Sequence, residues 1–407
     1  MKLRGSYGEV GNDQIGKRRF LYLPSTWYNG NSSIGGGYSF GNTNGSSTDP
    51  YYTGVSEGIV GNPNVTWERA RKSNFGLDWY FFKDRLTMTF DYFTEKRDNI
   101  LWDLGTVPAI VGAALAPANL GKVNNQGFEV SLGWNDNSKD FRYSVGINLS
   151  FADNKIEFMD EPAFPYEWMN TTGFALGQYK GYRTDGFYNN EGEASNRPYV
   201  SNDGNNVRAG DVRYVDIDGD GVIDNKDMTP IGYSNMPKFS FGTNIKLEYK
   251  GFSISTLFTG SYKGSIPMTS FYLQNPFYMT NNNALQFQYD GRWTPEKVEQ
   301  GIMPTFPRAS LRTHDSQNGV MSDLWLQSTQ FVRLKNLEIA YDITNLRSLK
   351  KIGLSNVRLF VNGSNLFTWG AKVIDGFDPE QLDAGGASDG FLYPPTQSYN
   401  FGVNVQF

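Results

Sequence analysis

The sequence predicts an all-β protein, an antiparallel transmembrane β-barrel segment of about ten strands with long extracellular loops. Three observations predict this fold: apolar and polar residues alternate over long stretches, short polar turns alternate with long loops, and aromatic residues and glycines are abundant. Aromatic residues make up 15% of the 407 residues, glycine contributes 45, and charged residues make up only 19%. Because successive side chains of a strand point to opposite faces, each strand offers lipid an apolar face and a watery interior a polar one.

The last eleven residues show the alternation most clearly. Tyr399, Phe401, Val403, Val405 and Phe407 share one face, and the residues between them are Asn, Gly, Asn and Gln. A tilted strand of this length can cross a bilayer. A half-buried strand of a soluble sandwich would show the same local pattern, so its recurrence along the chain decides between the two.

The pattern recurs in four hairpins and one further strand at the N-terminus. We expect the short turns at Lys83–Asp84, 135–139, Lys250–Gly251 and 344–354 to be periplasmic and the long connections to be extracellular, because outer-membrane barrels separate short and long connections in this way. The expected strands are 2–8, 73–82, 85–96, 128–134, 141–151, 239–249, 252–258, 330–343, 355–366 and 397–407.

Composition excludes several functions. The net charge is −5 without a basic cluster, which argues against nucleic-acid binding. The chain has no Cys and a single His, His314, so neither a His-based zinc site nor a Ser-His-Asp triad is expected. Glu191–Glu193 and Asp378–Glu380 are interpreted as loop charges, and we expect no enzymatic activity. The first residues lack the apolar core of a secretory signal, so we expect that Met1 does not start the complete protein.

The segment DIDGDGVIDNKD, residues 216–227, predicts a calcium site. Alternating acidic residues followed by glycine converge several oxygens in a tight turn, as Ca²⁺ requires. The expected ligands of a structural Ca²⁺ are five aspartate side chains and the backbone carbonyl of Val222. The aspartates are Asp216, Asp218, Asp220, Asp224 and Asp227. Position 12 of the motif is Asp rather than Glu, and the flanks do not read as helices. A solvated acidic turn is the alternative.

Aromatic residues in the long loops are candidate substrate contacts, because flat rings suit stacking on sugars or gripping peptides. The candidates are Trp27, Tyr28, Tyr166, Trp168, Trp293 and Trp325. The alternative is that such rings form small cores within the loops or mark the membrane boundary.

Several segments together resemble the C-terminal part of SusC/RagA-type TonB-dependent outer-membrane transporters of Bacteroidetes. They are NPNVTWERARKSNFGLDW (62–79), GKVNNQGFEVSLGW (121–134), GYRTDGFY (181–188), GDVRYVDIDGDGVIDNKDMTPIG (210–232), NMPKFSFGTNIKLEYKGFSIS (235–255), FVRLKNLEIAYDI (331–343) and VRLFVNGSNLFTW (357–369), with the aromatic-ended last strand. The resemblance covers nearly the whole chain.

The resemblance implies that residues 1–407 are the last ten strands of a barrel of about 22 strands, in the outer membrane of a Gram-negative cell. A plug and a TonB-contacting segment are not found in this sequence. The implied function is uptake of oligosaccharides or peptides with a SusD-like surface lipoprotein and TonB as partners. The terminal residues Tyr399, Phe401, Val403, Val405 and Phe407 would be the signal read by the barrel-assembly machinery. Two alternatives stay open: a self-contained ten-stranded passive pore or adhesin, and a secreted calcium-stabilised glycan-binding β protein.

Overall fold

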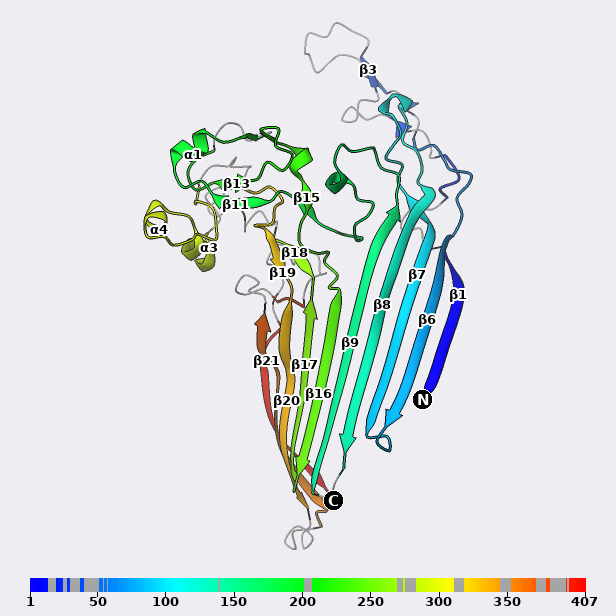
Figure 1. Cartoon of the computed structure of the whole chain (residues 1–407), viewed down its shortest axis with the longest axis vertical. Coiled ribbons are helices and arrows are strands. Elements are labelled where there is room, and N and C mark those ends of the chain that lie inside the picture. Colours follow the sequence, from blue (N-terminus) through cyan, green and yellow to red (C-terminus); the bar gives the residue numbers. More distant parts are fainter. Residues whose placement is uncertain are drawn as a thin grey trace.

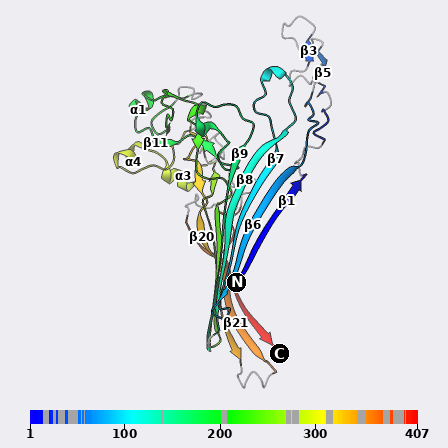
Figure 2. The same ribbon diagram turned by 45° about the vertical axis from the view of Figure 1, so that its right-hand side comes forward.

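Ten long strands in the computed structural model form one antiparallel sheet in which every strand pairs with its neighbours in the chain. The structure describes residues 1–13, 20–24, 28–29, 37–39, 51–53, 55–56, 58–137, 140–200, 207–268, 274, 283–310, 318–344, 353–370, 378–380, 393 and 395–407. The sheet is an open, twisted wall in Figures 1 and 2, with β1 and β22 at its two edges. Its strands are β1 (Lys2–Asn12), β6 (Glu68–Phe81), β7 (Leu86–Trp102), β8 (Ala118–Asp136), β9 (Phe141–Phe158), β16 (Phe239–Tyr249), β17 (Phe252–Tyr262), β20 (Phe331–Thr344), β21 (Asn356–Gly370) and β22 (Ser398–Gln406).

The predicted short turns are confirmed where the structure describes them. β6 and β7 are joined by residues 82–85, and Lys250 and Gly251 join β16 to β17. Both Lys250 and Gly251 have positive φ angles, 45° and 89°, as the tight hairpin turns that match strand twist require. The turn expected at 135–139 and the one at 344–354 lie partly outside the described residues.

Seven strands are longer than alternation predicts: β1, β6, β7, β8, β9, β17 and β21. The largest extensions are in β8, which begins at Ala118 rather than at residue 128, and in β9, which ends at Phe158 rather than at residue 151. β7 likewise continues from residue 96 to Trp102. Backbone pairing continues there although the apolar alternation ends, because these ends project above the apolar band and need no lipid-facing side chains. The wall therefore rises past the membrane into the loops.

One face of the wall carries two transverse rows of aromatic side chains. The upper row joins six strands in register: Phe75, Tyr92, Phe128, Phe151, Phe239 and Tyr262. The lower row consists of Phe141, Tyr249, Phe252 and Tyr341. Ring centroids lie 4.5 Å apart for Phe151 and Phe239 and 4.4 Å apart for Phe252 and Tyr341.

The separation of the rows matches a bilayer. On β16 the rows are ten residues apart, at Phe239 and Tyr249, which is about 34 Å along the strand. A tilt of about 35–45° reduces this to about 24–28 Å, against an apolar band of about 25 Å in outer-membrane barrels. On the same face Phe401 and Val403 are 79% and 60% exposed, and Phe407 is 92% exposed. A β-sandwich would bury such residues against a second sheet, and no second sheet covers this face among the described residues. This argues against the alternative of a secreted glycan-binding β protein.

The opposite face, here called the lumen face, carries charged residues in compensated clusters. The guanidinium of Arg4 on β1 donates to Asp78 on β6 and Asp91 on β7 at 2.9–3.1 Å. Gly76 lies beneath this guanidinium, since a Cβ there would meet Arg4 Cζ at 2.6 Å. Arg358 likewise donates to Glu338 and Asp342 at 2.8 and 2.7 Å. These charges suit a watery interior rather than a dry core.

The β9–β16 and β17–β20 connections fold into a body above the wall, here called the outer body (Figure 1). It contains the helices α1 (Glu191–Ser195), α3 (Gln286–Gly291) and α4 (Pro295–Glu299) and the 3-10 helices η3 (Glu167–Met169) and η4 (Asn225–Asp227). Its short strands are β10 (Lys180–Gly181), β11 (Thr184–Phe187), β12 (Tyr199–Val200), β13 (Val212–Tyr214), β14 (Val222–Ile223), β15 (Thr229–Pro230), β18 (Ser265–Pro267) and β19 (Leu326–Ser328). The β1–β6 connection lies apart from the outer body (Figures 1 and 2) and holds β2 (Tyr28–Asn29), β3 (Gly37–Ser39), β4 (Tyr51–Thr53) and β5 (Val55–Ser56). The 3-10 helix η2 (Ala109–Val111) belongs to the β7–β8 connection.

The two longest loops pack together rather than standing apart. Residues of the β9–β16 connection, including Val212 and Tyr214, share a buried cluster with Trp293 of the β17–β20 connection. Loops of this length need an apolar core of their own to offset the entropy of ordering them. Among the described residues, no helix has the length and apolar character needed to cross a membrane.

Candidate functional site

The acidic segment 216–227 forms a tight turn in the outer body, closed by η4. Oxygens of Asp216, Asp218 and Asp227 lie within 4.8 Å of one another. Asp216 accepts hydrogen bonds from the backbone N–H groups of Gly219 and Gly221 at 2.7 and 2.8 Å. Both glycines have positive φ angles, 76° and 82°, which lets the chain wrap around the carboxylate.

Asp227 anchors the turn from its other end. Its side chain is fully buried and accepts from the N–H groups of Ile217 and Asp224 at 2.7 and 2.9 Å. Asp224 in turn caps η4 by accepting from the N–H of Lys226 at 2.7 Å. The first and last acidic residues of the motif are thereby brought together by local hydrogen bonds.

Lys226 divides the predicted ligand set. Its ammonium lies 2.6 Å from Asp220 and 3.7 Å from Asp224. The hydrogen bond with Asp220 raises the pKa of Lys226 and lowers that of Asp220. Two of the five predicted carboxylates therefore face a lysine in this structure, and three face one another. Val222 lies in β14, which pairs in parallel with β12.

Asp218 is the least compensated member of the cluster. Its side chain is 1% exposed, and its buried Oδ2 has no hydrogen-bond partner among the described residues. The Lys226 ammonium approaches this oxygen only to 4.0 Å. Burial, followed by the charge of Asp218, raises the pKa of the neighbouring Tyr166 phenol. A buried carboxylate oxygen without a partner is unfavourable, and a bound cation would satisfy it.

Two predicted aromatic contacts lie against this turn. The rings of Tyr166 and Trp168 stack with centroids 4.5 Å apart and an interplanar angle of 5°. The indole Nε1 of Trp168 donates to the carbonyl oxygen of Lys226 at 2.7 Å. Both side chains are half-buried, so they join the acidic turn to the loop that follows β9.

The other predicted aromatic contacts divide into two groups. Trp293 and Trp325 are 8% and 2% exposed, and Trp325 donates to the carbonyl of Asn318 at 2.6 Å. Their buried rings stabilise the outer body and leave no face for stacking on a substrate, which corrects the expectation for these two. Trp27 lies outside the described residues, and of Tyr28 only the backbone, in β2, is described.

One ionic cluster was not predicted by the sequence. Arg333 on β20 is 2% exposed and donates to Asp378 and Glu380 at 2.6 and 2.9 Å. Its Nε also donates to Thr368 on β21 at 2.9 Å. The pair Asp378–Glu380, interpreted from sequence as loop charges, is thus tied to the wall by a residue 45 positions earlier in the chain. Nothing in the local sequence signals a contact at this separation.

Comparison with known proteins agrees with this geometry. A family model described as TonB dependent receptor-like, beta-barrel, matches residues 2–366. The chain belongs to this family. It is 27% identical over its whole length to TonB-dependent receptor P3 of Formosa agariphila and 26% identical to TonB-dependent receptor SusC of Bacteroides thetaiotaomicron. It covers 39% and 37% of these two proteins, so it spans about two-fifths of the relatives it matches.

Solved structures show the same fold. The structure of the RagAB peptide transporter matches with a TM-score of 0.65 and 21% identity. The match covers 100% of this chain and 40% of the RagAB chain. The RagAB peptide importer in the 'open-open' state matches with a TM-score of 0.64 and 20% identity. The chain is therefore a C-terminal barrel portion of a SusC/RagA-like protein of the outer membrane. The predicted fold class and location are confirmed, and the family is one of receptors rather than enzymes.

Proposed function

We propose that this chain forms part of the wall and outer loops of a TonB-dependent importer that takes up oligosaccharides or peptides. A SusD-like lipoprotein would cover the outer body, and TonB would supply the drive through a plug outside residues 1–407. The proposal involves binding and passage of the substrate, without chemistry on it. The barrel-assembly machinery would recognise the exposed apolar face that ends at Phe407.

The observation that carries this proposal is the asymmetry of the wall together with the family match. The lipid face has two aromatic rows at bilayer spacing, and the lumen face has compensated charges such as Arg4 with Asp78 and Asp91. Both outer edges, β1 and β22, are unpaired among the described residues. An unpaired edge in lipid costs several kcal/mol for each backbone group. This disfavours a ten-stranded pore and supports further strands on each side.

The proposal is tested in a host carrying the complete protein. Uptake of labelled peptide and oligosaccharide pools is compared with and without TonB, and the tagged protein is purified to identify a co-purifying lipoprotein. An importer should lose uptake without TonB and should retain the lipoprotein. Uptake that continues at the same rate without TonB would support the passive-pore alternative instead.

We further propose that the turn 216–227 binds Ca²⁺ as a structural ion of the outer body. Asp216, Asp218 and Asp227 would supply the nearest oxygens, and Asp220, Asp224 and the Val222 carbonyl would join if Lys226 moves aside. Carboxylate oxygens are the ligands that Ca²⁺ prefers. The partnerless buried oxygen of Asp218 supports the proposal, because a cation would compensate its charge.

The calcium proposal is tested by terbium luminescence, because Tyr166 and Trp168 lie beside the turn and can transfer excitation to bound Tb³⁺. The complete protein should show sensitised emission that Ca²⁺ displaces, and Asp218→Asn should abolish it. Asp185→Asn removes a 69% exposed carboxylate of the same body and should leave the emission unchanged. Emission that survives Asp218→Asn would contradict this site.

A further inference from the structure

A cavity of about 410 Å³ lies on the wall where β6, β7, β8 and β9 rise toward the outer body. Glu95 and Arg97 of β7 and Asn125 of β8 line it, and they alternate with Tyr92 and Phe128 of the lipid-facing upper row. The cavity therefore opens on the lumen face, above the membrane band. Segments 175–176 and 234–238 of the β9–β16 connection complete it. Its size falls within the range of small-molecule pockets, about 300–1,000 Å³.

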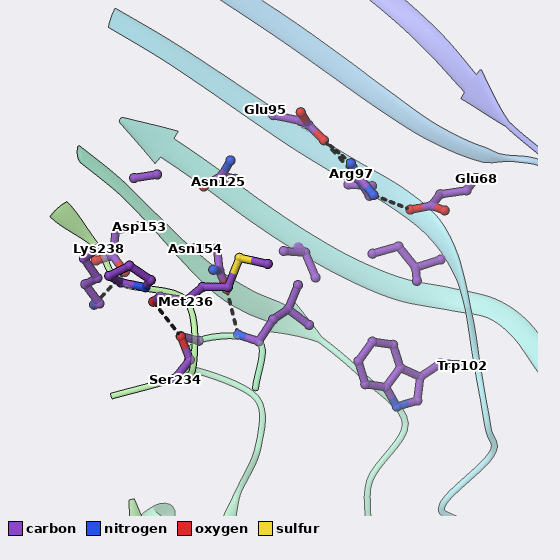
Figure 3. Close-up of a pocket in the computed structure, with 16 residues that line it drawn as sticks. Glu68, Glu95, Arg97, Trp102, Asn125, Asp153, Asn154, Ser234, Met236 and Lys238 are labelled. Atoms are coloured by element: carbon purple, nitrogen blue, oxygen red, sulfur yellow. Dashed lines mark hydrogen bonds and ion pairs between the residues drawn. The ribbon is translucent and has the colours of Figure 1, made fainter. Parts of the chain in front are cut away.

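The floor of this wall pocket is apolar. Val123 of β8 is buried, and Ile100 and Trp102 of β7 lie beside it. Leu176 and Met236 approach from the loop side and are 42% and 66% exposed, so they offer apolar surface that nothing described covers. Figure 3 shows Trp102 at one end of the pocket and Met236 above its middle.

The rim of the wall pocket is charged but neutralised. At one end Arg97 donates to Glu95 at 2.6 Å and to Glu68 at 3.2 Å (Figure 3). Lys72 lies 3.2 Å from Glu95, so two cations face two carboxylates at this end. At the other end Lys238 lies 2.6 Å from Asp153. Since the rim charges satisfy one another, the pocket has little preference for a charged ligand. Between the two ends, the side-chain amide of Asn125 has no hydrogen-bond partner among the described residues.

We propose that the wall pocket holds an apolar or aromatic side chain of a peptide substrate on its way into the lumen. This inference rests on the proposed import function and selects peptides over oligosaccharides. The floor takes the side chain, and the free amide of Asn125 hydrogen-bonds the adjoining peptide backbone. A charged ligand could pair with the rim only by breaking the ion pairs of Arg97 or Lys238. Charged side chains are therefore disfavoured in the pocket.

The floor disfavours a sugar ring. A sugar presents hydroxyl groups around its whole edge, and hydroxyls buried without hydrogen-bond partners are unfavourable. The side chains of Ile100, Val123 and Leu176 offer no such partners, and Oδ1 of the neighbouring Asn154 already accepts a hydrogen bond from the Leu176 backbone N–H at 2.7 Å. A leucine or phenylalanine side chain needs no such partner. Burying a side chain of this size favours binding by roughly tenfold to hundredfold over a small polar one.

The test fills the pocket. Ala152 of β9 lines it and is exposed, so Ala152→Phe occupies the cavity without displacing buried atoms. Ser144→Phe is the matched control, because Ser144 lies on the same face of β9, nearer the short-turn end and away from the pocket. The complete protein and both variants are incubated with N-acetylated pentapeptides whose central residue is randomised. Bound peptides are quantified by mass spectrometry, with a malto-oligosaccharide pool as a parallel arm.

We expect the wild type and Ser144→Phe to enrich Phe, Leu and Met at the central position at least tenfold over Ser and Asp. Ala152→Phe should lose this enrichment. Three results overturn the inference: no peptide bound by the wild type, the same selectivity in Ala152→Phe, or oligosaccharide binding that only Ala152→Phe abolishes. If the complete protein still shows TonB-dependent uptake when one of these three results is obtained, only the pocket inference fails and the proposed import function is retained.

Discussion

Replacing Ile245 by arginine should destabilise the protein through the lipid face alone. Ile245 lies on β16, six residues from the upper-row Phe239 and four from the lower-row Tyr249. It pairs laterally with Val145 and Thr256. This position is close to the middle of the apolar band, where a charge is farthest from water on either side.

The expected cost follows from this depth. A charged side chain on the lipid face of a barrel costs about 2–4 kcal/mol at the midplane and about 0–1 kcal/mol near the interfaces. The free energy of unfolding should therefore fall by about 2–4 kcal/mol in Ile245→Arg. Ser255→Arg is the matched control, because Ser255 is an exposed residue of the lumen face, in register with Glu338. Its added charge faces water, with Glu338 in register on one neighbouring strand and Lys246 on the other. The Lys246 charge is itself paired with Glu248 at 2.6 Å, so the change should be small.

Guanidinium titration of the complete protein in phospholipid vesicles measures both variants, with tryptophan fluorescence as the signal. Heat-modifiable migration on gels checks that each variant folds before titration. Equal losses in the two variants would refute the assignment of faces, and a larger loss in Ser255→Arg would reverse it.

Three further predictions concern topology, packing and pH. Residues 1–407 have no native cysteine, so an introduced cysteine can be labelled selectively in this part of the protein. In intact cells Asn137→Cys, in a periplasmic turn, should resist an impermeant thiol reagent, whereas Met303→Cys, at a 90% exposed position of the outer body, should react. The reverse labelling would invert the orientation of the wall in the membrane. Gly76→Val should displace the Arg4 guanidinium above it and lower the unfolding temperature, whereas Gly8→Val, with no atom within 4 Å of the added Cβ, should not; equal melting temperatures would contradict the packing. Although burial opposes it, hydrogen bonds from Thr171 and Thr172 hold the pKa of Glu161 below its ordinary value of 4.5, so this loop contact should stabilise at neutral pH and weaken as the pH falls through the folded-state pKa. Glu161→Gln should remove that acid dependence from hydrogen exchange of the loop, and an unchanged pH profile would count against it.

The strands could be predicted from the sequence because their side chains meet two different solvents. A period of two is visible wherever one face is apolar and the other polar, as from Phe239 to Tyr249, where the predicted and observed strands coincide. The tight turn at Lys250–Gly251 could also be predicted from neighbouring residues, because it lies between two alternating runs. Strand ends above the membrane, such as the one reaching Trp102, lose the signal because both faces there meet water or loop.

The acidic turn was only partly readable. Alternate aspartates with glycines predict a convergent turn, and the hydrogen bonds from Gly219 and Gly221 to Asp216 form within a few residues. The sequence did not indicate that Lys226 would face Asp220, or that Asp218 would be buried with an oxygen lacking a partner. Both depend on how η4 packs against the turn and on Tyr166, 52 residues before Asp218 in the chain.

The sequence by itself determined the alternation, the order of short and long connections and the acidic motif, because each is encoded within neighbouring residues. Only the tertiary structure decided which distant side chains meet. Arg333 reaches Asp378 and Glu380, Trp293 packs with Val212, and Glu68, Arg97 and Lys238 surround one pocket. Such contacts arise from strand register and loop packing, which depend on the summed burial and pairing of the whole wall, and no single segment carries that information.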